Sequence, residues 1–332
     1  MTVKYSVLVL LVIVSGAFGK PAPKSIVELA NEARTVELRE IRRIEGGPGF
    51  DARLYQYESA GLKVHTMIAW PDRPMPKRGF PILVFNHGHH PDPPNYGISA
   101  DGRNWRPGDY YRRIPELYAA EGFAVVIPDY RGHNTSEGLE FTEGLLESAY
   151  YTEDVLNLLA GLPAVDGLDA DRVFVLGHSM GGDVTLRTLL ATGNVTAASL
   201  WSSVGGDVWN QAYYYSRYDD PPGPDGSAIE TSVIERLRAQ LSDLDGEFDT
   251  DSIDSYRFLG RLQAPVIIHH AVGDRSAAYE WSKRLAGQLA ARGKRYEFWS
   301  YDSEDHLFKG CDLSLAVERD VKWFRRFDPP LL

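Results

Sequence analysis

The chain has 332 residues, of which 43% are apolar and 24% are charged, a balance close to the globular average that excludes a wholly disordered or collagen-like protein. The formal net charge is −11 and no block rich in Lys and Arg occurs, so we expect no nucleic-acid partner. The single cysteine, Cys311, excludes an internal disulfide framework and a cysteine-rich zinc module.

The first 19 residues have the pattern of a secretory signal peptide. Lys4 precedes an apolar run over residues 7–14, and the small residues Ala17 and Gly19 end the segment. The run is shorter than the roughly 20 residues that a membrane-spanning helix needs. The alternative is a buried helix or strand. We expect cleavage after Gly19, a secreted or periplasmic protein, and no stable membrane insertion.

Apolar segments alternate with helix-like segments along most of the chain. Residues 36–70 are predicted to form strands, with an in–out alternation over residues 62–70 that is typical of antiparallel pairing. Short apolar runs without alternation predict buried strands at 81–85, 123–127, 172–176, 197–203 and 265–269, and a last strand at 295–301. Helices are predicted at 109–121, 145–159, 180–191, 276–291 and 313–327.

This order predicts an α/β protein with a mostly parallel central sheet and helices on both faces. No internal repeat and no linker occur, so residues 20–332 are expected to form one domain. The stretch between residues 203 and 265 is longer than a strand–helix–strand step requires. We therefore predict a lid insertion at about residues 207–260, beside the active site, with a helix near 229–244.

A Gly-His-Ser-Met-Gly sequence at residues 177–181 directly follows a predicted strand and directly precedes a predicted helix. This strand–turn–helix context is the one that a nucleophile elbow requires. We expect Ser179 to be the nucleophile and the amide of Met180, at the helix N-terminus, to face a developing oxyanion. The alternative is an ordinary turn with a serine helix cap.

A serine nucleophile needs a general base and an acid that orients the base. Beyond His269 and His270 at the end of the fifth buried strand the chain has one histidine, His306, in the loop after the last strand. Asp274 follows the fifth strand, where functional groups of such sheets gather. Asp302, Glu304 and Asp305 are alternatives on the loop of His306, but a neighbour of the base rarely reaches its other ring nitrogen.

The loop after the first buried strand reads Asn86-His-Gly-His-His90. Gly88 permits a close approach of the backbone, and the amide of His89 is the expected second oxyanion donor. The alternative use of His87, His89 and His90 is a metal site. The metallo-hydrolase spacing H-x-H-x-D-H is not met, so we expect no metal.

These motifs together resemble the serine hydrolases of the α/β-hydrolase superfamily, in the branch of dienelactone-hydrolase-like esterases and prolyl-oligopeptidase-like catalytic domains. The matching stretches are Asn86–Gly88, Pro128–His133 with Ser136 and Gly138, Gly177–Gly182, His270–Asp274 with Ser282, and Tyr301–Phe308. The resemblance implies the triad Ser179–Asp274–His306 with no metal and no organic cofactor. Two positions depart from the family pattern: Ala271 stands where Gly is usual, and Ala277-Ala278 replaces Val-Pro.

The expected reaction is hydrolysis of a carboxylic ester through an acyl-enzyme, on a small or polymer-linked substrate such as an acylated carbohydrate or an aromatic ester. Aromatic residues of the lid and the oxyanion loop are candidate stacking surfaces for the substrate: Tyr96, Trp105, Trp209, Tyr213, Tyr214 and Tyr215. Packing of the lid onto the body is an equal alternative for them. The other possible functions are a serine peptidase of prolyl-oligopeptidase-like type and a non-catalytic binding protein on the same fold.

Overall fold

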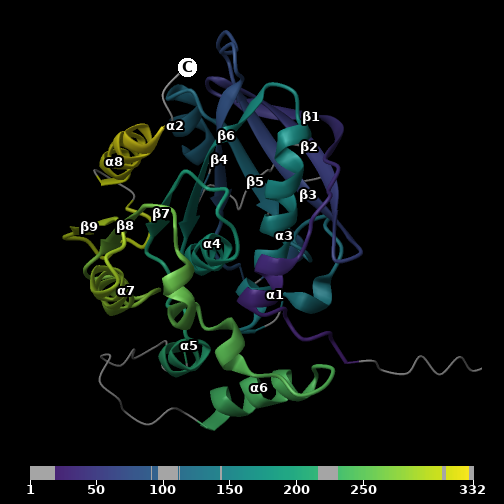
Figure 1. Ribbon diagram of the computed structural model, residues 1–332, viewed down its shortest axis with the longest axis vertical. Coiled ribbons are helices and arrows are strands. Elements are labelled where there is room, and N and C mark those ends of the chain that lie inside the picture. The colour runs from purple at the N-terminus through teal and green to yellow at the C-terminus, as the bar shows by residue number, and fades with distance from the viewer. Residues whose placement is uncertain are drawn as a thin grey trace, which may run out of the picture.

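A nine-stranded sheet runs through the part of the chain that the structure, a computed structural model, describes: residues 19–90, 92–95, 111, 113–142, 144–215, 231–308 and 312–328. Its strand order is β1-β2-β3-β5-β4-β6-β7-β8-β9 (Figure 1). The first strands, β1 (Arg39–Gly47), β2 (Phe50–Ser59) and β3 (Leu62–Pro71), form an antiparallel meander, and β3 pairs antiparallel with β5 (Ala124–Asp129).

The remaining strands are parallel, which confirms the predicted fold class. They are β4 (Phe80–Asn86), β5, β6 (Leu168–His178), β7 (Ala197–Trp201), β8 (Val266–Ala271) and β9 (Tyr296–Tyr301). Every residue of β4, β5, β7 and β8 is buried. Burial on both faces explains why these runs are apolar without alternation.

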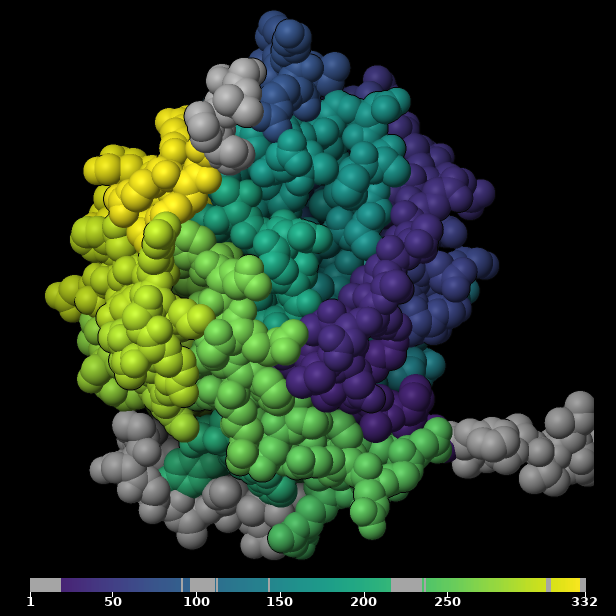
Figure 2. Space-filling view, viewed as in Figure 1, coloured from purple at the N-terminus to yellow at the C-terminus, as the bar shows by residue number. Residues whose placement is uncertain are grey.

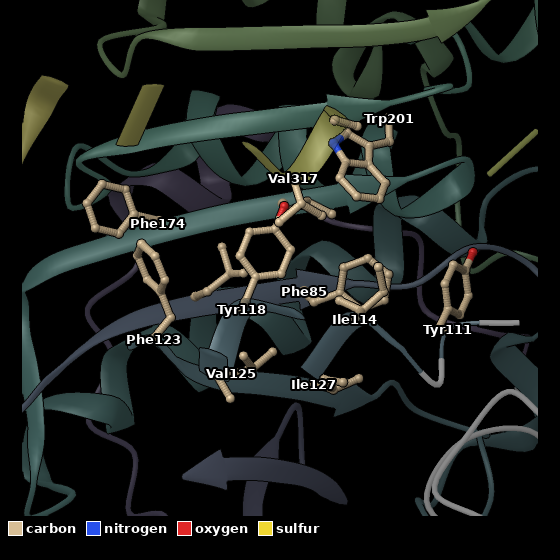
Figure 3. Close-up of a cluster of buried hydrophobic side chains, with 14 of the residues drawn as sticks. Phe85, Tyr111, Ile114, Tyr118, Phe123, Val125, Ile127, Phe174, Trp201 and Val317 are labelled. Atoms are coloured by element: carbon tan, nitrogen blue, oxygen red, sulfur yellow. The ribbon is translucent and has the colours of Figure 1, made fainter. Parts of the chain in front are cut away.

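Helices cover both faces of the sheet. One face packs against α3 (Glu147–Gly161), α4 (Met180–Ala191) and α7 (Tyr279–Ala291), with α1 (Ile26–Asn31) beside α4. The other face packs against α2 (Arg113–Ala120) and α8 (Asp312–Phe327). There Phe123 and Phe174 meet in the aromatic cluster of Figure 3, and the rings of Phe174 and Phe324 lie 4.9 Å apart. Short 3-10 turns occur at Pro93–Asn95, Leu139–Phe141, Leu162–Ala164, Thr250–Ile253 and Ser255–Arg261.

Between β7 and β8 the chain leaves the sheet in the region where the sequence predicts the insertion. The described part of this segment contains α5 (Val208–Tyr215) and α6 (Thr231–Ser242), which lie together at the lower end of Figure 1. The buried carboxylate of Asp183 on α4 joins this segment to the body. It accepts hydrogen bonds from Ser148 of α3 at 2.7 Å, from Ser255 at 3.1 Å and from Arg187 at 3.0 Å.

The main chain joins this segment to the body's N-terminal end at Lys20. The amide of Lys20 donates to the carbonyl of Asp243 at 2.8 Å, and the amide of Asp245 donates to the carbonyl of Lys20 at 2.9 Å. In Figure 2 the purple N-terminal segment lies against the green residues that follow α6. None of the helices in the described ranges is both long and apolar enough to cross a membrane.

Some helix starts differ from the sequence prediction. The helix expected from residue 276 begins at Tyr279, because the carboxylate of Asp274 holds the amides of Ser276 and Ala277 in a turn, at 2.8 and 3.1 Å. The helix expected from residue 109 is described from Arg113, and residues 109, 110 and 112 lie outside the described ranges. At residues 276–278, the hydrogen bonds from the loop amides to Asp274 therefore outweigh the helix propensity of the sequence.

Candidate active site

Ser179 occupies the sharp turn between β6 and α4. Its backbone has φ +58° and ψ −124°, a conformation that a residue with a Cβ rarely adopts. A methyl group at Gly177 would lie 2.1 Å from the carbonyl oxygen of Gly181, and one at Gly181 would lie 2.0 Å from that of Asn86. Both flanking positions therefore require glycine, and the turn presents a half-buried serine side chain.

Asp274 and His306 are brought together from two loops that follow neighbouring strands, β8 and β9. Nδ1 of His306 donates to Oδ2 of Asp274 at 2.6 Å. Oδ1 of the same carboxylate accepts the amides of Ser276 and Ala277. The carboxylate thereby fixes the proton of the imidazole on Nδ1 and leaves Nε2 as the basic nitrogen, which is the tautomer that a general base needs.

The environment of Asp274 keeps its carboxyl group ionised. Burial opposes ionisation, but hydrogen bonds and charge interactions with His270 and His306 outweigh it and hold the pKa of Asp274 far below the ordinary value. His270 lies beneath the turn, with Nε2 at 3.5 Å from Oδ2 of Asp274 and at 3.1 Å from the carbonyl oxygen of Ala277. Asp274 is thus a buried anion that faces the imidazole of His306.

The other acidic residues near the base make different contacts. Oδ1 of Asp305 accepts the amide of Leu307 at 2.9 Å, which shapes the loop around His306. Asp302 is exposed. The carboxylate that contacts the imidazole of His306 in this structure is that of Asp274.

His178, the residue before Ser179, connects the turn at Ser179 to the loop of His306. Its Nε2 lies 2.9 Å from the carbonyl oxygen of His306, so this nitrogen must be the donor. Its Nδ1 is then an acceptor for the hydroxyl of Tyr111. That hydroxyl in turn accepts the amide of Gly88 at 3.0 Å. Burial foremost, and the nearby His306, keep the pKa of His178 well below the usual value, so this linker stays neutral.

The loop after β4 passes directly over the nucleophile. A methyl group at Gly88 would lie 3.0 Å from Cβ of Ser179. The amide of Gly88 is used by Tyr111 and that of Ser179 by the carbonyl of Trp201. The next N–H groups on the two segments are those of His89 and Met180, and the latter begins α4, where amides have no acceptor within the helix. That the amides of His89 and Met180 act as oxyanion donors remains a prediction.

A pair that the sequence did not indicate lies on the α3 side of Ser179. Nδ1 of His89 lies 2.7 Å from Oε1 of Glu147, the first residue of α3, and Tyr151 donates to the other oxygen of this carboxylate at 3.4 Å. The carboxylate of Glu147 is buried, whereas the side chain of His89 is half exposed. Only the packing of α3 against the oxyanion loop brings these two residues together. The one feature of the sequence that could have drawn attention to this pair is an acidic residue, Glu147, at the start of a predicted helix.

Replacing Glu147 by glutamine is expected to lower the pKa of His89. Burial lowers the pKa of this imidazole, but the hydrogen bond and the negative charge of Glu147 outweigh burial and raise it above 6.5. Histidine titration followed by NMR measures the change, with the exposed Glu140→Gln as a control that should not alter it. A wild-type pKa at or below that of the Glu147→Gln variant would contradict the pairing.

The predicted substrate-stacking residues fall into two groups. Tyr96 and Trp105 lie outside the described residues. On α5, Trp209 donates to the hydroxyl of Thr250 at 3.3 Å, and the hydroxyls of Tyr214 and Tyr215 donate to the carbonyls of Arg275 and Ser276 at 2.8 and 3.2 Å. The two tyrosine contacts show packing of α5 onto the body, whereas the contact of Trp209 lies within the insertion. Contact of these residues, or of Tyr213 on the same helix, with a substrate remains a prediction.

The three histidines of the oxyanion loop make separate contacts. Nδ1 of His87 is 2.9 Å from the carbonyl of Gly88, and Nδ1 of His90 accepts the amide of Asp92 at 3.0 Å, while His89 faces Glu147. Burial lowers the pKa of His87 to about 4. No group of three potential metal-ligating side chains is gathered among the described residues.

Comparison with known proteins places these features in context. The α/β hydrolase fold family matches residues 82–229 of the chain. A protein of Bacillus subtilis (strain 168) described as the uncharacterized peptidase YtmA is 25% identical over 287 residues, which cover 84% of this chain and 95% of that protein.

Solved structures with the same fold include both peptidases and esterases. The acylaminoacyl peptidase of Pyrococcus horikoshii superposes with a TM-score of 0.63 at 17% identity over 86% of this chain. This chain spans only 43% of that peptidase. The acetyl xylan esterase of Paenibacillus sp. R4 superposes with a TM-score of 0.63 at 16% identity and covers 94% of this chain and 98% of its own.

Proposed function

We propose that this chain, which matches the α/β hydrolase fold family over residues 82–229 and shares the fold of peptidases and esterases, is a serine hydrolase that cleaves carboxylic esters through an acyl-enzyme. The observation that carries the proposal is the 2.6 Å hydrogen bond between Asp274 and His306. It is joined to a serine held at φ +58° in the turn before α4 through His178, the residue before that serine, whose Nε2 lies 2.9 Å from the carbonyl oxygen of His306. Ser179 is the proposed nucleophile, His306 the base and Asp274 the orienting acid. A binding protein would need none of these constraints.

In the proposed mechanism Nε2 of His306 takes the proton of the Ser179 hydroxyl as the oxygen attacks the substrate carbonyl. The amides of Met180 and His89 stabilise the tetrahedral oxyanion, an effect worth about 3 kcal/mol per donor in comparable sites. The imidazolium then protonates the leaving alcohol, and Asp274 stabilises its charge. Water repeats the cycle on the acyl-enzyme and releases the acid.

An ester is the preferred substrate class because a solved acetyl xylan esterase corresponds to this chain over its whole length, whereas this chain spans only 43% of the solved acylaminoacyl peptidase. On the same helix as the packed Tyr214 and Tyr215, Trp209 and Tyr213 are the aromatic residues of the insertion that we propose to receive an acylated carbohydrate or an aromatic ester. A serine peptidase is the second candidate. Its support is the relative described as a peptidase, which this chain matches over nearly its full length.

The two candidates separate in an assay with matched chromogenic substrates. We expect turnover of p-nitrophenyl acetate and labelling by a fluorophosphonate, with little turnover of aminoacyl p-nitroanilides. An acetylated xylan oligosaccharide then tests the carbohydrate ester. Preferred turnover of the anilides would move the assignment to a peptidase. Absence of both activities and of labelling in folded protein would leave a binding function.

We also propose that the protein is exported and that its mature chain begins at Lys20. The support is the signal-like pattern of residues 1–19 together with the main-chain bonds of Lys20 to residues 243 and 245. Mass spectrometry of the protein secreted from a cell that expresses the full sequence should find Lys20 at the N-terminus. Retention of residues 1–19 on protein recovered from inside the cell would contradict export.

A further inference from the structure

The turn that carries the proposed catalytic acid is held from several sides. Oδ1 of Asp274 binds the amides of Ser276 and Ala277, while Oδ2 binds His306. From below, Nε2 of His270 lies 3.1 Å from the carbonyl of Ala277, and Nδ1 lies 2.7 Å from the hydroxyl of Ser282 on α7. The two amides therefore set the rotation of the carboxylate, and the position of this turn sets the position of the base.

The carbonyl groups of the same turn are bound by the end of α5. The hydroxyl of Tyr214 donates to the carbonyl of Arg275 at 2.8 Å, and that of Tyr215 donates to the carbonyl of Ser276 at 3.2 Å. Arg275 and Ser276 are the two residues that follow Asp274. Consecutive side chains of the insertion thus bind consecutive carbonyls of the acid turn.

The rings of both tyrosines are fixed by packing. The ring of Tyr214 lies 4.8 Å from that of Trp281 at the start of α7, and the ring of Tyr215 lies 6.1 Å from it. Tyr214 and Trp281 form one buried cluster with Val204 and Ala277. Ala277 is completely buried there, and its amide is one of the two that bind Asp274. The hydroxyl groups therefore reach the acid turn from a rigid support.

We propose that Tyr214 and Tyr215 are positioning residues for the Asp274–His306 pair. The carbonyl of Arg275 and the amide of Ser276 belong to one peptide group, and the carbonyl of Ser276 and the amide of Ala277 belong to the next. The two tyrosine hydroxyls bind the carbonyls of these peptide groups, and the amides of the same groups orient the carboxylate of Asp274. The insertion thereby contributes to the catalytic step itself as well as covering the body. The peptide planes couple the two sides of the turn, because a rotation that loses one hydrogen bond displaces the other.

This inference rests on the proposed function and names a role for residues that the sequence assigned to substrate stacking. The two roles predict different kinetics. If the tyrosine ring stacks on the substrate, it affects KM, and a phenylalanine, which keeps the ring, should leave KM unchanged. If the hydroxyl positions Asp274, it affects kcat, and a phenylalanine, which lacks the hydroxyl, should lower kcat.

The test compares Tyr214→Phe, Tyr215→Phe and the double variant with the wild type on p-nitrophenyl acetate. Loss of both hydroxyl bonds should lower kcat roughly 5- to 30-fold with little change in KM, in line with one to two hydrogen bonds. The matched control is Tyr256→Phe, which loses a buried hydroxyl bond of 3.2 Å to the carbonyl of Trp281 and leaves the acid turn untouched. Its kcat should stay near the wild-type value.

A second readout is independent of turnover. The Nδ1 proton of His306, bound to a carboxylate, gives a downfield proton resonance, which should shift or broaden in the double variant and stay unchanged in Tyr256→Phe. An unchanged kcat and resonance in the double variant, or a rise of KM alone, would overturn the positioning role. A wild type that shows the resonance but no ester turnover would instead overturn the proposed function.

Discussion

Ser179→Ala is expected to abolish ester turnover, with a fall in kcat of about 10⁶-fold, as loss of a serine nucleophile produces in comparable enzymes. The alanine keeps the Cβ, so the backbone conformation at φ +58° is no more strained than before. The fold should therefore persist, as circular dichroism and thermal unfolding can verify. Labelling by a fluorophosphonate, located by mass spectrometry, should occur on Ser179 of the wild type and disappear from the variant.

Ser202→Ala is the matched control for this experiment. Ser202 follows β7, the strand next to β6, and also has a positive φ, +42°. Its side chain is buried and its hydroxyl has no hydrogen-bond partner among the described residues. We expect near wild-type turnover for this variant. Persistent turnover or labelling in Ser179→Ala would show that another residue is the nucleophile.

Asp274→Asn is expected to lower kcat by about 10⁴-fold with little change in the overall fold, because an amide in place of the carboxylate favours the wrong tautomer of the base. The amides of Ser276 and Ala277 require an oxygen at the Oδ1 position, so the asparagine NH₂ group would face His306. Nδ1 of His306 would then have to accept a hydrogen bond. Its proton would move to Nε2, which could no longer take the proton of Ser179.

The control for the acid is Asp302→Asn, an exposed residue in the loop of His306. Its kcat should remain close to that of the wild type. Steady-state kinetics on p-nitrophenyl acetate measure both variants under the same conditions. A large loss in Asp302→Asn and a small one in Asp274→Asn would reverse the assignment of the acid.

The lowered pKa of Asp274 also predicts how the stability difference between the wild type and Asp274→Asn depends on pH. Because the folded state binds the proton of this carboxyl more weakly than the unfolded state, the ionised group stabilises the fold above the unfolded pKa of about 3.9. The stabilisation is lost as the pH falls towards the folded value. Urea unfolding should therefore show the advantage of wild type over Asp274→Asn near neutral pH, and a smaller one as the pH falls below about 4.

The sequence predicted the parallel part of the sheet because burial on both faces leaves uninterrupted apolar runs, as in β4 and β8. It also predicted α4 from Met180 to Ala191, directly after the serine. The start of α7 was wrong by three residues, at Tyr279 instead of Ser276. There a long-range contact decides the local structure, because the same Asp274 that binds His306 also caps the turn.

The pairing of Glu147 with His89 and the contact of Tyr111 with His178 could not be predicted. The two members of the first pair are 58 residues apart and those of the second 67, and no spacing rule connects them. For the tyrosines of α5 the sequence left substrate stacking and packing of the lid onto the body as equal alternatives, without naming the groups that their hydroxyls bind. Their hydroxyl groups turn out to bind the carbonyls of Arg275 and Ser276.

The sequence by itself determined the fold class and nominated the serine, the base and the acid, because local constraints of glycine, strand and helix surround Ser179 and because one histidine follows the fifth buried strand. The tertiary structure alone decided which carboxylate contacts His306, which charge faces the oxyanion loop and where the insertion binds. These are contacts between segments far apart in the chain. Their geometry depends on how loops after different strands meet at one edge of the sheet, which local residue patterns do not encode.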